Sequence, residues 1–231
     1  MTRWVSSQLF GLADALQLIR DLFPPGVLPQ NDHKLQPPHR DLSPERILCF
    51  ETKGITHCVL KIADFGSMQY HDDQAHHQRG FETCMGSAYR APELLTGEPA
   101  HSSDLWSFAC IILHFIVWYH GGWALVNALS ALSSAEEEEC LGAYTDDDKF
   151  FKYGHLMATQ LGGEVIGQGK DVPNTIVLKE SIEQEMSKYL EQGKSHFVRD
   201  IIGLVKKDLL QADAGERASF SDAYCRSTLS S

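Results

Sequence analysis

A regular pattern of apolar and polar positions opens the chain at residues 3–22. Apolar residues recur there at steps of three and four: Val5, Leu9, Leu12, Leu16, Ile19 and Phe23. Such spacing places them on one face of an amphipathic helix. Pro24-Pro25-Gly26 predicts its end, and the proline-rich residues 24–38 are expected to form a loop.

Two short apolar runs, 47–50 and 59–62, are typical of strands, and Thr52-Lys53-Gly54 between them predicts a turn. The polar stretch 67–83 has no periodicity and is expected to be a long loop. Long loops inside compact domains are usually functional or disordered.

The longest apolar run lies within a predicted helix over 104–119, which Gly121-Gly122 is expected to end. That run, Phe108–Tyr119, is shorter than the ~20 residues that a membrane-spanning helix needs. A buried core helix is therefore the preferred interpretation, and no membrane contact is expected.

An acidic and then glycine-rich insertion, 133–170, follows the central helix, and its acidic run is expected to be a solvated face. Further helices are predicted near 180–192, 196–210 and 219–228. The pattern as a whole predicts one mainly α domain of the α+β class over 1–231, with a short β-hairpin.

Charge and cysteine usage narrow the function classes. Lys and Arg number 20 against 31 Asp and Glu, a net charge of −11. Sequence-independent nucleic-acid binding is disfavoured, because it depends on basic side chains meeting phosphates.

None of the six cysteines has C-x-x-C spacing, so no zinc or thioredoxin-type site is indicated. Buried free thiols in a reducing compartment are preferred to disulfides, and the protein is expected to be intracellular, cytoplasmic or nuclear.

Several short motifs stand in a fixed order. His39-Arg40-Asp41 precedes the first strand, Asp64-Phe65-Gly66 follows the second, and Ala91-Pro92-Glu93 follows the polar loop. Asp104-Leu105-Trp106 opens the central helix, and Glu216-Arg217 lies near the end. In this order the chain resembles the eukaryotic-type protein kinases of the Ser/Thr class. Two further segments, 118–123 and 146–151, are similar to fungal kinase-like proteins.

The resemblance implies a division into a catalytic loop and Asp-Phe-Gly segment (39–66), an activation segment (67–93) and C-terminal helices (180–231). It implies that Asp41 accepts the hydrogen bond of the substrate hydroxyl and that Asp64 holds Mg²⁺ against the phosphates of ATP. Asp64 and Leu48 would contact the nucleotide. Each aspartate could instead belong to a local turn.

The remaining implied roles are regulatory or structural. Arg40 would bind a phosphate on the activation segment, with Thr83 or Ser87 as acceptors, or it would pair with a local acid. His39, Phe65, Gly66 and Trp106 would be structural. Asp104 would orient the 39–41 backbone, and Glu93 and Arg217 would form a buried ion pair.

Two departures from the family pattern fall in the catalytic loop. Arg46 stands where the family has a metal-binding Asn, and a guanidinium cannot ligate a metal, because it has donors and no acceptor. It could contact phosphate directly. Ser43 stands where the family has a lysine, so a positive contact to the transferred phosphate is lost. Arg46 and Ser43 are thus the altered catalytic positions.

No G-x-G-x-x-G loop and no V-A-I-K-like lysine stand before His39. The resemblance therefore implies only the larger, C-terminal lobe of a kinase, with its N-lobe absent. ATP and Mg²⁺ are the implied cofactors, and their binding by this chain is doubtful. Three functions stay open: an impaired Ser/Thr kinase, a pseudokinase scaffold and a relic. A surface near Leu48, Ile111 and Phe115 is expected to be uncovered and to meet a protein substrate, a partner or a second copy.

Overall fold

In the computed structural model the described residues are 2–22, 34–35, 39–51, 58–65, 70–71, 88–96, 102–141, 149–154, 175–192 and 195–218. The predicted helix near 219–228 lies outside them, as do Gly66, Thr83 and Ser87.

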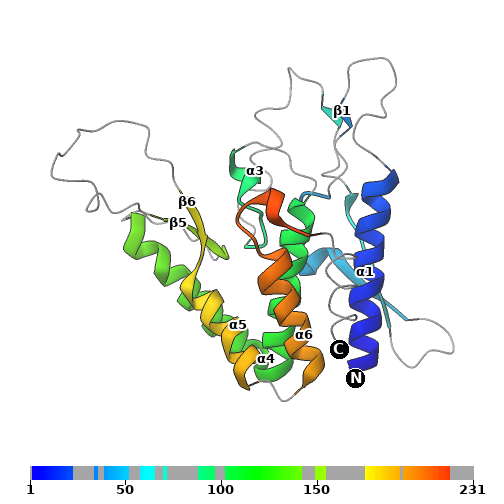
Figure 1. The fold of residues 1–231 in the computed structure, drawn as a ribbon. Helices are drawn as coiled ribbons and strands as arrows, with labels where there is room; N and C mark the ends of the chain where they lie inside the picture. Colours follow the sequence, from blue (N-terminus) through cyan, green and yellow to red (C-terminus); the bar gives the residue numbers. More distant parts are fainter. Residues whose placement is uncertain are drawn as a thin grey trace.

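Helices build most of the described structure, as the sequence predicts. The long helix α4 (Ser103–Leu141) stands at the centre of the molecule, and α1 (Thr2–Leu22), α5 (Glu180–Gln192) and α6 (His196–Leu204) stand around it (Figure 1). A π-helical turn, η3 (Val205–Leu209), continues α6, and a short helix, α3 (Glu93–Thr96), precedes α4. Val5, Leu9, Leu12 and Leu16 of α1 are buried, so the predicted apolar face does turn to the core.

Helix α4 does not end where the glycine pair predicts. Gly122 leaves the helical conformation (φ 62°, ψ −165°), but a second helical segment begins at once and runs to Leu141. This backbone region is open essentially to glycine alone. The glycine therefore kinks the helix and does not end it.

The beginning of the acidic run belongs to this second segment of α4, and Glu136 is not merely solvated. Its carboxylate accepts hydrogen bonds from the backbone N–H groups of Glu180 (2.9 Å) and Ser181 (2.6 Å) and pairs with Lys152 (3.1 Å). Burial raises the pKa of Glu136, but these hydrogen bonds outweigh it and the pKa lies below its usual value. For this residue the prediction of a free acidic face is wrong, because the first turn of α5 needs acceptors for its N–H groups.

Among the residues that the structure describes, the strands form three antiparallel pairs. β2 (Ile47–Phe50) and β3 (Val59–Ile62) make the predicted hairpin, with Ile47 opposite Ile62 and Phe50 opposite Val59. β5 (Phe151–Gly154) pairs with β6 (Thr175–Leu178), which the sequence pattern did not predict. A two-residue pair, β1 (Lys34–Leu35) with β4 (Tyr70–His71), interrupts the two segments expected to be loops.

Cys49 and Cys58 form a disulfide across the β2–β3 hairpin, with their Cα atoms 5.6 Å apart. The prediction of free thiols is wrong for these two residues and correct for Cys110, which is free and buried. Cysteine spacing alone missed the pair because the hairpin brings residues together that are separated by a turn.

Helix α4 is also the one described helix that could span a membrane by length and composition. The stretch Ser103–Glu136 contains an 18-residue window of mean hydropathy 1.6, half of which is buried inside the protein. The core helix of a soluble protein passes the same test, and Trp106, Phe108, Ile112 and Leu113 are all fully buried. The expectation that the protein avoids membranes stays a prediction.

Candidate functional site

The loop that begins at His39 rests on the first turn of α4. One oxygen of the Asp104 carboxylate accepts the backbone N–H of His39 (2.6 Å), and the other accepts that of Arg40 (2.8 Å). Burial raises the pKa of Asp104, although these two backbone hydrogen bonds oppose the effect. Asp104 thus fixes the backbone immediately before Asp41.

The β2–β3 hairpin brings together the two ends that carry the acidic residues. Ser43 precedes the short 3-10 helix η1 (Pro44–Arg46), which leads into β2, and Asp64 follows β3. The Ala63 N–H donates to the Arg46 carbonyl (2.9 Å) and extends the ladder beyond Ile47 and Ile62. Arg46 and Asp64 are therefore neighbours at the open end of the hairpin.

Arg46 bridges both candidate catalytic carboxylates. Its Nη2 lies 2.5 Å from Asp41 Oδ2, and its Nε donates to Asp64 Oδ2 at 3.2 Å. Its Nη1 donates to the hydroxyl of Ser43 at 3.2 Å. One guanidinium thus contacts all three of the other residues that the sequence singles out for catalysis and metal binding.

The environments of the two carboxylates differ. The Asp41 side chain is 10% exposed, and burial raises its pKa while the charge of Arg46 acts in the opposite direction. The Asp64 side chain is 60% exposed, and its backbone is left-handed at φ 62°. Arg40 is left-handed too, at φ 64°. Such backbone is uncommon for residues other than glycine and clusters at functional sites.

This arrangement fits Mg²⁺ poorly. Magnesium takes hard oxygen ligands in an octahedron, and here a fixed cation already lies between the two carboxylates. Across the described ranges, no group of three or more His, Cys, Asp or Glu side chains could hold a metal ion. As arranged, these side chains are engaged in charge pairing.

His39 and Phe65, for which the resemblance implies structural roles, lie next to each other. His39 is fully buried, its Nε2 lies 2.9 Å from the Ala63 carbonyl, and its ring lies 5.3 Å from that of Phe65. Leu48, which was expected on the uncovered surface, is 44% exposed. Ile111, in contrast, is buried, so its assignment to that surface is wrong: its side chain packs into the α4 core.

A buried ion pair ties the segment after the polar loop to the C-terminal region. Arg217 Nη1 and Nη2 contact the two oxygens of Glu93 at 2.5 and 2.8 Å. Arg217 Nε donates to the Gln211 carbonyl (2.7 Å), and its guanidinium lies 5.0 Å from the Trp106 ring centroid. A bidentate, hydrogen-bonded pair of this kind holds α3 against the C-terminal segment that carries Arg217.

Sequence reasoning missed one polar contact near the site. The hydroxyl of Tyr89 lies 2.8 Å from His114 Nδ1, and the Tyr89 carbonyl accepts a hydrogen bond from Ser107 (2.7 Å). Burial lowers the pKa of His114 to about 4. The signal in the sequence that could have indicated this contact was His114, a lone histidine inside an apolar helix.

Thr83, Ser87 and Gly66 lie outside the described residues, so their roles stay predictions.

Comparison with known sequences agrees with the motif order. Residues 33–121 match the family described as protein kinase domain. This segment is therefore similar to protein kinase domains. This kinase-related segment contains the catalytic loop, the Asp-Phe-Gly segment, Glu93 and the first part of α4.

Curated kinases are similar over limited stretches. The glycogen synthase kinase-3 homolog YGK3 of Saccharomyces cerevisiae is 33% identical over 140 residues, 53% of this chain and 34% of that protein. The human SNF-related serine/threonine-protein kinase is 34% identical over 86 residues, 36% of this chain and 10% of that kinase.

Cyclin-dependent kinase 11.1 of Caenorhabditis elegans is 40% identical over 88 residues, 37% of this chain and 11% of that kinase. The chain thus spans about a third or less of the length of these relatives. No solved structure matches it significantly. The likeness to a yeast kinase fits the fungal resemblance of the sequence.

Proposed function

We propose that this chain carries a protein kinase-like domain of the Ser/Thr class whose phosphoryl transfer is impaired by Arg46. The observation that carries the proposal is the Arg46 guanidinium lying between Asp41 and Asp64, at 2.5 and 3.2 Å. Phosphoryl transfer depends on a free carboxylate near the attacking hydroxyl and on metal ions that neutralise the phosphates. Arg46 opposes both requirements.

The electrostatic argument has two steps. First, a cation beside Asp64 reduces the attraction of that carboxylate for Mg²⁺, since like charges repel. Second, the ion pair with Arg46 occupies one oxygen of Asp41, which would otherwise accept the substrate hydroxyl. We infer that ATP and Mg²⁺, the cofactors of the family, bind this chain weakly or not at all. Asp41, Ser43, Arg46, Asp64 and Leu48 remain the proposed site.

The architecture that accompanies this proposal is a single domain equivalent to the C-terminal lobe of a kinase. It is supported by the central α4, the hairpin next to the catalytic loop and the Glu93–Arg217 pair. Intracellular localisation goes with it as a prediction, and the Cys49–Cys58 disulfide does not favour a reducing compartment.

The test is a thermal-shift titration of the purified chain with ATP and Mg²⁺. We expect no change in Tm for the wild type and a rise of several degrees for Arg46→Asn, because a ligand stabilises the state that it binds. Arg46→Lys is the matched control, since it keeps the charge and adds no acceptor oxygen; its Tm should not move.

Two results would overturn the proposal. One is a shift of several degrees in the wild type, or phosphorylation of a Ser/Thr peptide that disappears in Asp41→Asn. The other is an Arg46→Asn variant that responds no more than Arg46→Lys, because Arg46 would then not be the obstacle.

A second candidate function, a protein-binding scaffold, is favoured by the exposed apolar side chains of the hairpin. Leu48 (44% exposed) and Phe50 (45%) lie on the same face of β2, since side chains alternate along a strand. The occupant that we propose for this face is a second copy of the chain, which a measurement of oligomeric state tests.

A further inference from the structure

The Cys49–Cys58 disulfide lies at the turn end of the hairpin whose open end carries Arg46 and Asp64. Cys49 stands opposite Leu60 in the β2–β3 register, and Cys58 immediately precedes β3, so the bond joins the strands diagonally. From there the paired strands run to Ile47 and Ile62 and then to the Arg46–Ala63 hydrogen bond. The disulfide therefore constrains the same two strands that set the distance between Arg46 and Asp64.

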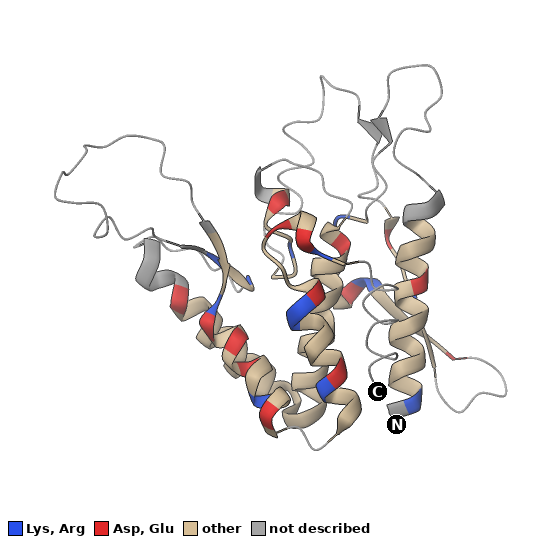
Figure 2. Ribbon diagram, in the orientation of Figure 1, with Lys and Arg blue, Asp and Glu red and all other residues tan. Residues whose placement is uncertain are grey.

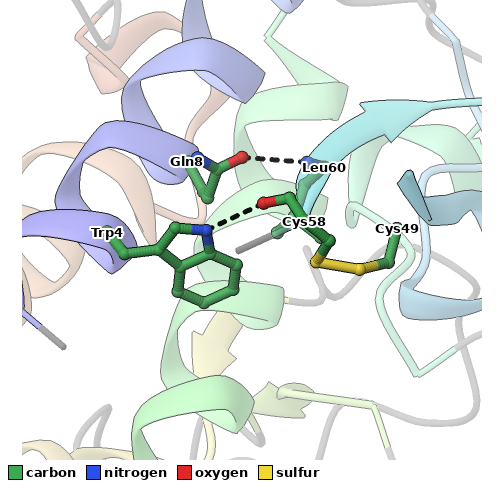
Figure 3. The surroundings of a disulfide bond; sticks show 5 residues. All are labelled: Trp4, Gln8, Cys49, Cys58 and Leu60. Atoms are coloured by element: carbon green, nitrogen blue, oxygen red, sulfur yellow. Dashed lines mark hydrogen bonds between the residues drawn. A yellow bond between two sulfur atoms is a disulfide. The ribbon is translucent and has the colours of Figure 1, made fainter. Parts of the chain in front are cut away.

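Helix α1 packs against the same end of the hairpin. The indole Nε1 of Trp4 donates to the Cys58 carbonyl (2.8 Å), and the Gln8 side-chain oxygen accepts the N–H of Leu60 (2.8 Å). Figure 3 shows both side chains reaching from α1 to the strand beside the sulfur–sulfur bond. Two turns of α1 thus bind the backbone of the strand at the positions that the disulfide fixes.

The sulfurs are in reach of a reductant. Cys49 is exposed and Cys58 half-buried, whereas the free thiol of Cys110 is fully buried. Exposed disulfides are the labile or regulatory ones, because an attacking thiolate needs access to one sulfur. Burial raises the pKa of Cys110 well above its usual value, which keeps that thiol out of such exchange.

We propose that Cys49–Cys58 is a redox-sensitive clamp that docks α1 onto the β2–β3 hairpin and sets the geometry of its Arg46–Asp64 end. A dithiol reductant reverses it: one thiolate attacks a protein sulfur and releases the other cysteine as a thiolate. The second thiol of the reductant then resolves the mixed disulfide. Two electrons and two protons pass to the protein as two thiols, and the reductant leaves as its own disulfide.

The reduced hairpin keeps its ladder but loses its only covalent constraint among the described residues. Because Trp4 and Gln8 bind the Cys58 carbonyl and the Leu60 N–H, fluctuation of this end is transmitted to the beginning of α1. Protection of α1 and of β2–β3 should therefore fall together, while that of α5 and α6 should not change.

The test is hydrogen exchange followed by mass spectrometry on the whole chain, before and after dithiothreitol treatment without denaturant. We expect exchange of 2–12, 47–51 and 58–62 to become at least tenfold faster and Tm to fall by about 5 °C or more. Exchange of 180–192 and 195–204 should not change. Non-reducing peptide mapping checks the Cys49–Cys58 bond itself.

Two variants complete the experiment. Cys49→Ser/Cys58→Ser should match the reduced wild type and not respond to dithiothreitol. Trp4→Phe, which removes the indole donor, should speed exchange of α1 while the disulfide stays intact. Alkylation of Cys110 measures global unfolding and should stay slow throughout.

The proposal is overturned if Cys49 and Cys58 of the air-oxidised protein are alkylated as free thiols. It is also overturned if reduction leaves α1 exchange unchanged, or if the double variant still responds to dithiothreitol. None of these outcomes depends on ATP binding, so they are independent of the proposed role of Arg46.

Discussion

At the scale of single residues, the ion pairs of this protein differ in how deeply they are buried. The buried pairs are expected to contribute more to stability than the exposed ones. Arg217 and Glu93 are both buried and joined through two short hydrogen bonds. Lys188, in contrast, is 59% exposed beside Glu185. Truncating one partner of a buried pair leaves an uncompensated charge, whereas exposed pairs contribute little.

Replacement of Arg217 by alanine should lower the free energy of unfolding by about 3–5 kcal/mol, because Glu93 would stay buried without its partner. Urea denaturation of the two proteins measures the difference. Gln184→Ala, which removes an exposed contact to Glu180 on α5, is the control and should change stability by less than about 0.5 kcal/mol. Equal effects of the two substitutions would contradict the buried pair.

His114 should make stability depend on pH. Its pKa is about 4 in the folded protein and about 6.5 in the unfolded chain, so the unfolded chain binds the proton first as pH falls. The contribution is complete above about pH 6.5 and is lost as pH falls from there towards 4. Between pH 7.5 and 4.5 the wild type should lose about 2 kcal/mol more than His114→Phe.

Denaturation curves at the two pH values measure this loss, and the comparison cancels the titration of the many carboxylates. If the wild type and His114→Phe showed the same pH dependence, His114 would have the same pKa in the folded and unfolded states, which would contradict the prediction.

At the scale of elements, one glycine decides the course of the longest helix. Gly122 turns α4 without ending it, and the second segment then carries Glu136 to the N-terminus of α5. Figure 2 marks the charged positions along α5, the helix whose first N–H groups Glu136 binds. The kink therefore links the central helix with the start of the next one.

Gly122→Ala should destabilise the protein by about 1–3 kcal/mol, because its φ of 62° with ψ near 180° is open essentially to glycine alone. A Cβ there would meet no atom within 4 Å, so the cost comes from the backbone itself.

Gly11→Ala is the matched control. It lies inside α1 with equally open space, and should stabilise by about 0.5–1 kcal/mol. The urea midpoints of the two variants should therefore shift in opposite directions. If Gly122→Ala stabilised the protein, the non-helical backbone of Gly122 would be contradicted.

At the scale of the whole molecule, the core is covered, but the hairpin presents apolar side chains to solvent, as do parts of α1 and α4. Leu48 and Phe50 are exposed, and Lys61 lies over the Phe50 ring at 5.1 Å. Exposed apolar patches mark interaction sites. This distribution supports the scaffold function that we propose second.

We expect the chain to self-associate through this face. Light scattering after size exclusion should give a mass above that of a monomer, increasing with concentration, and Leu48→Lys/Phe50→Lys should return it to the monomer. Leu132→Lys, at a more exposed position on α4, should not change the mass. If the wild type were a monomer at all concentrations, self-association through the Leu48 and Phe50 face would be contradicted.

Patterns that are local in the chain were determined by the sequence alone. The three- and four-residue steps of α1, the two strands of the β2–β3 hairpin and the helices α5 and α6 follow from side-chain periodicity, which each segment carries by itself. The motif order was enough to indicate the protein kinase family.

Only the tertiary structure decided what those residues touch. Arg46 was known to be unable to bind a metal, but its bridge between Asp41 and Asp64 depends on how the hairpin closes. The same holds for the Cys49–Cys58 bond, the pairing of β5 with β6, the continuation beyond Gly122 and the role of Glu136. The physical reason is that hydrogen bonds, ion pairs and disulfides form across space, between atoms that folding brings together.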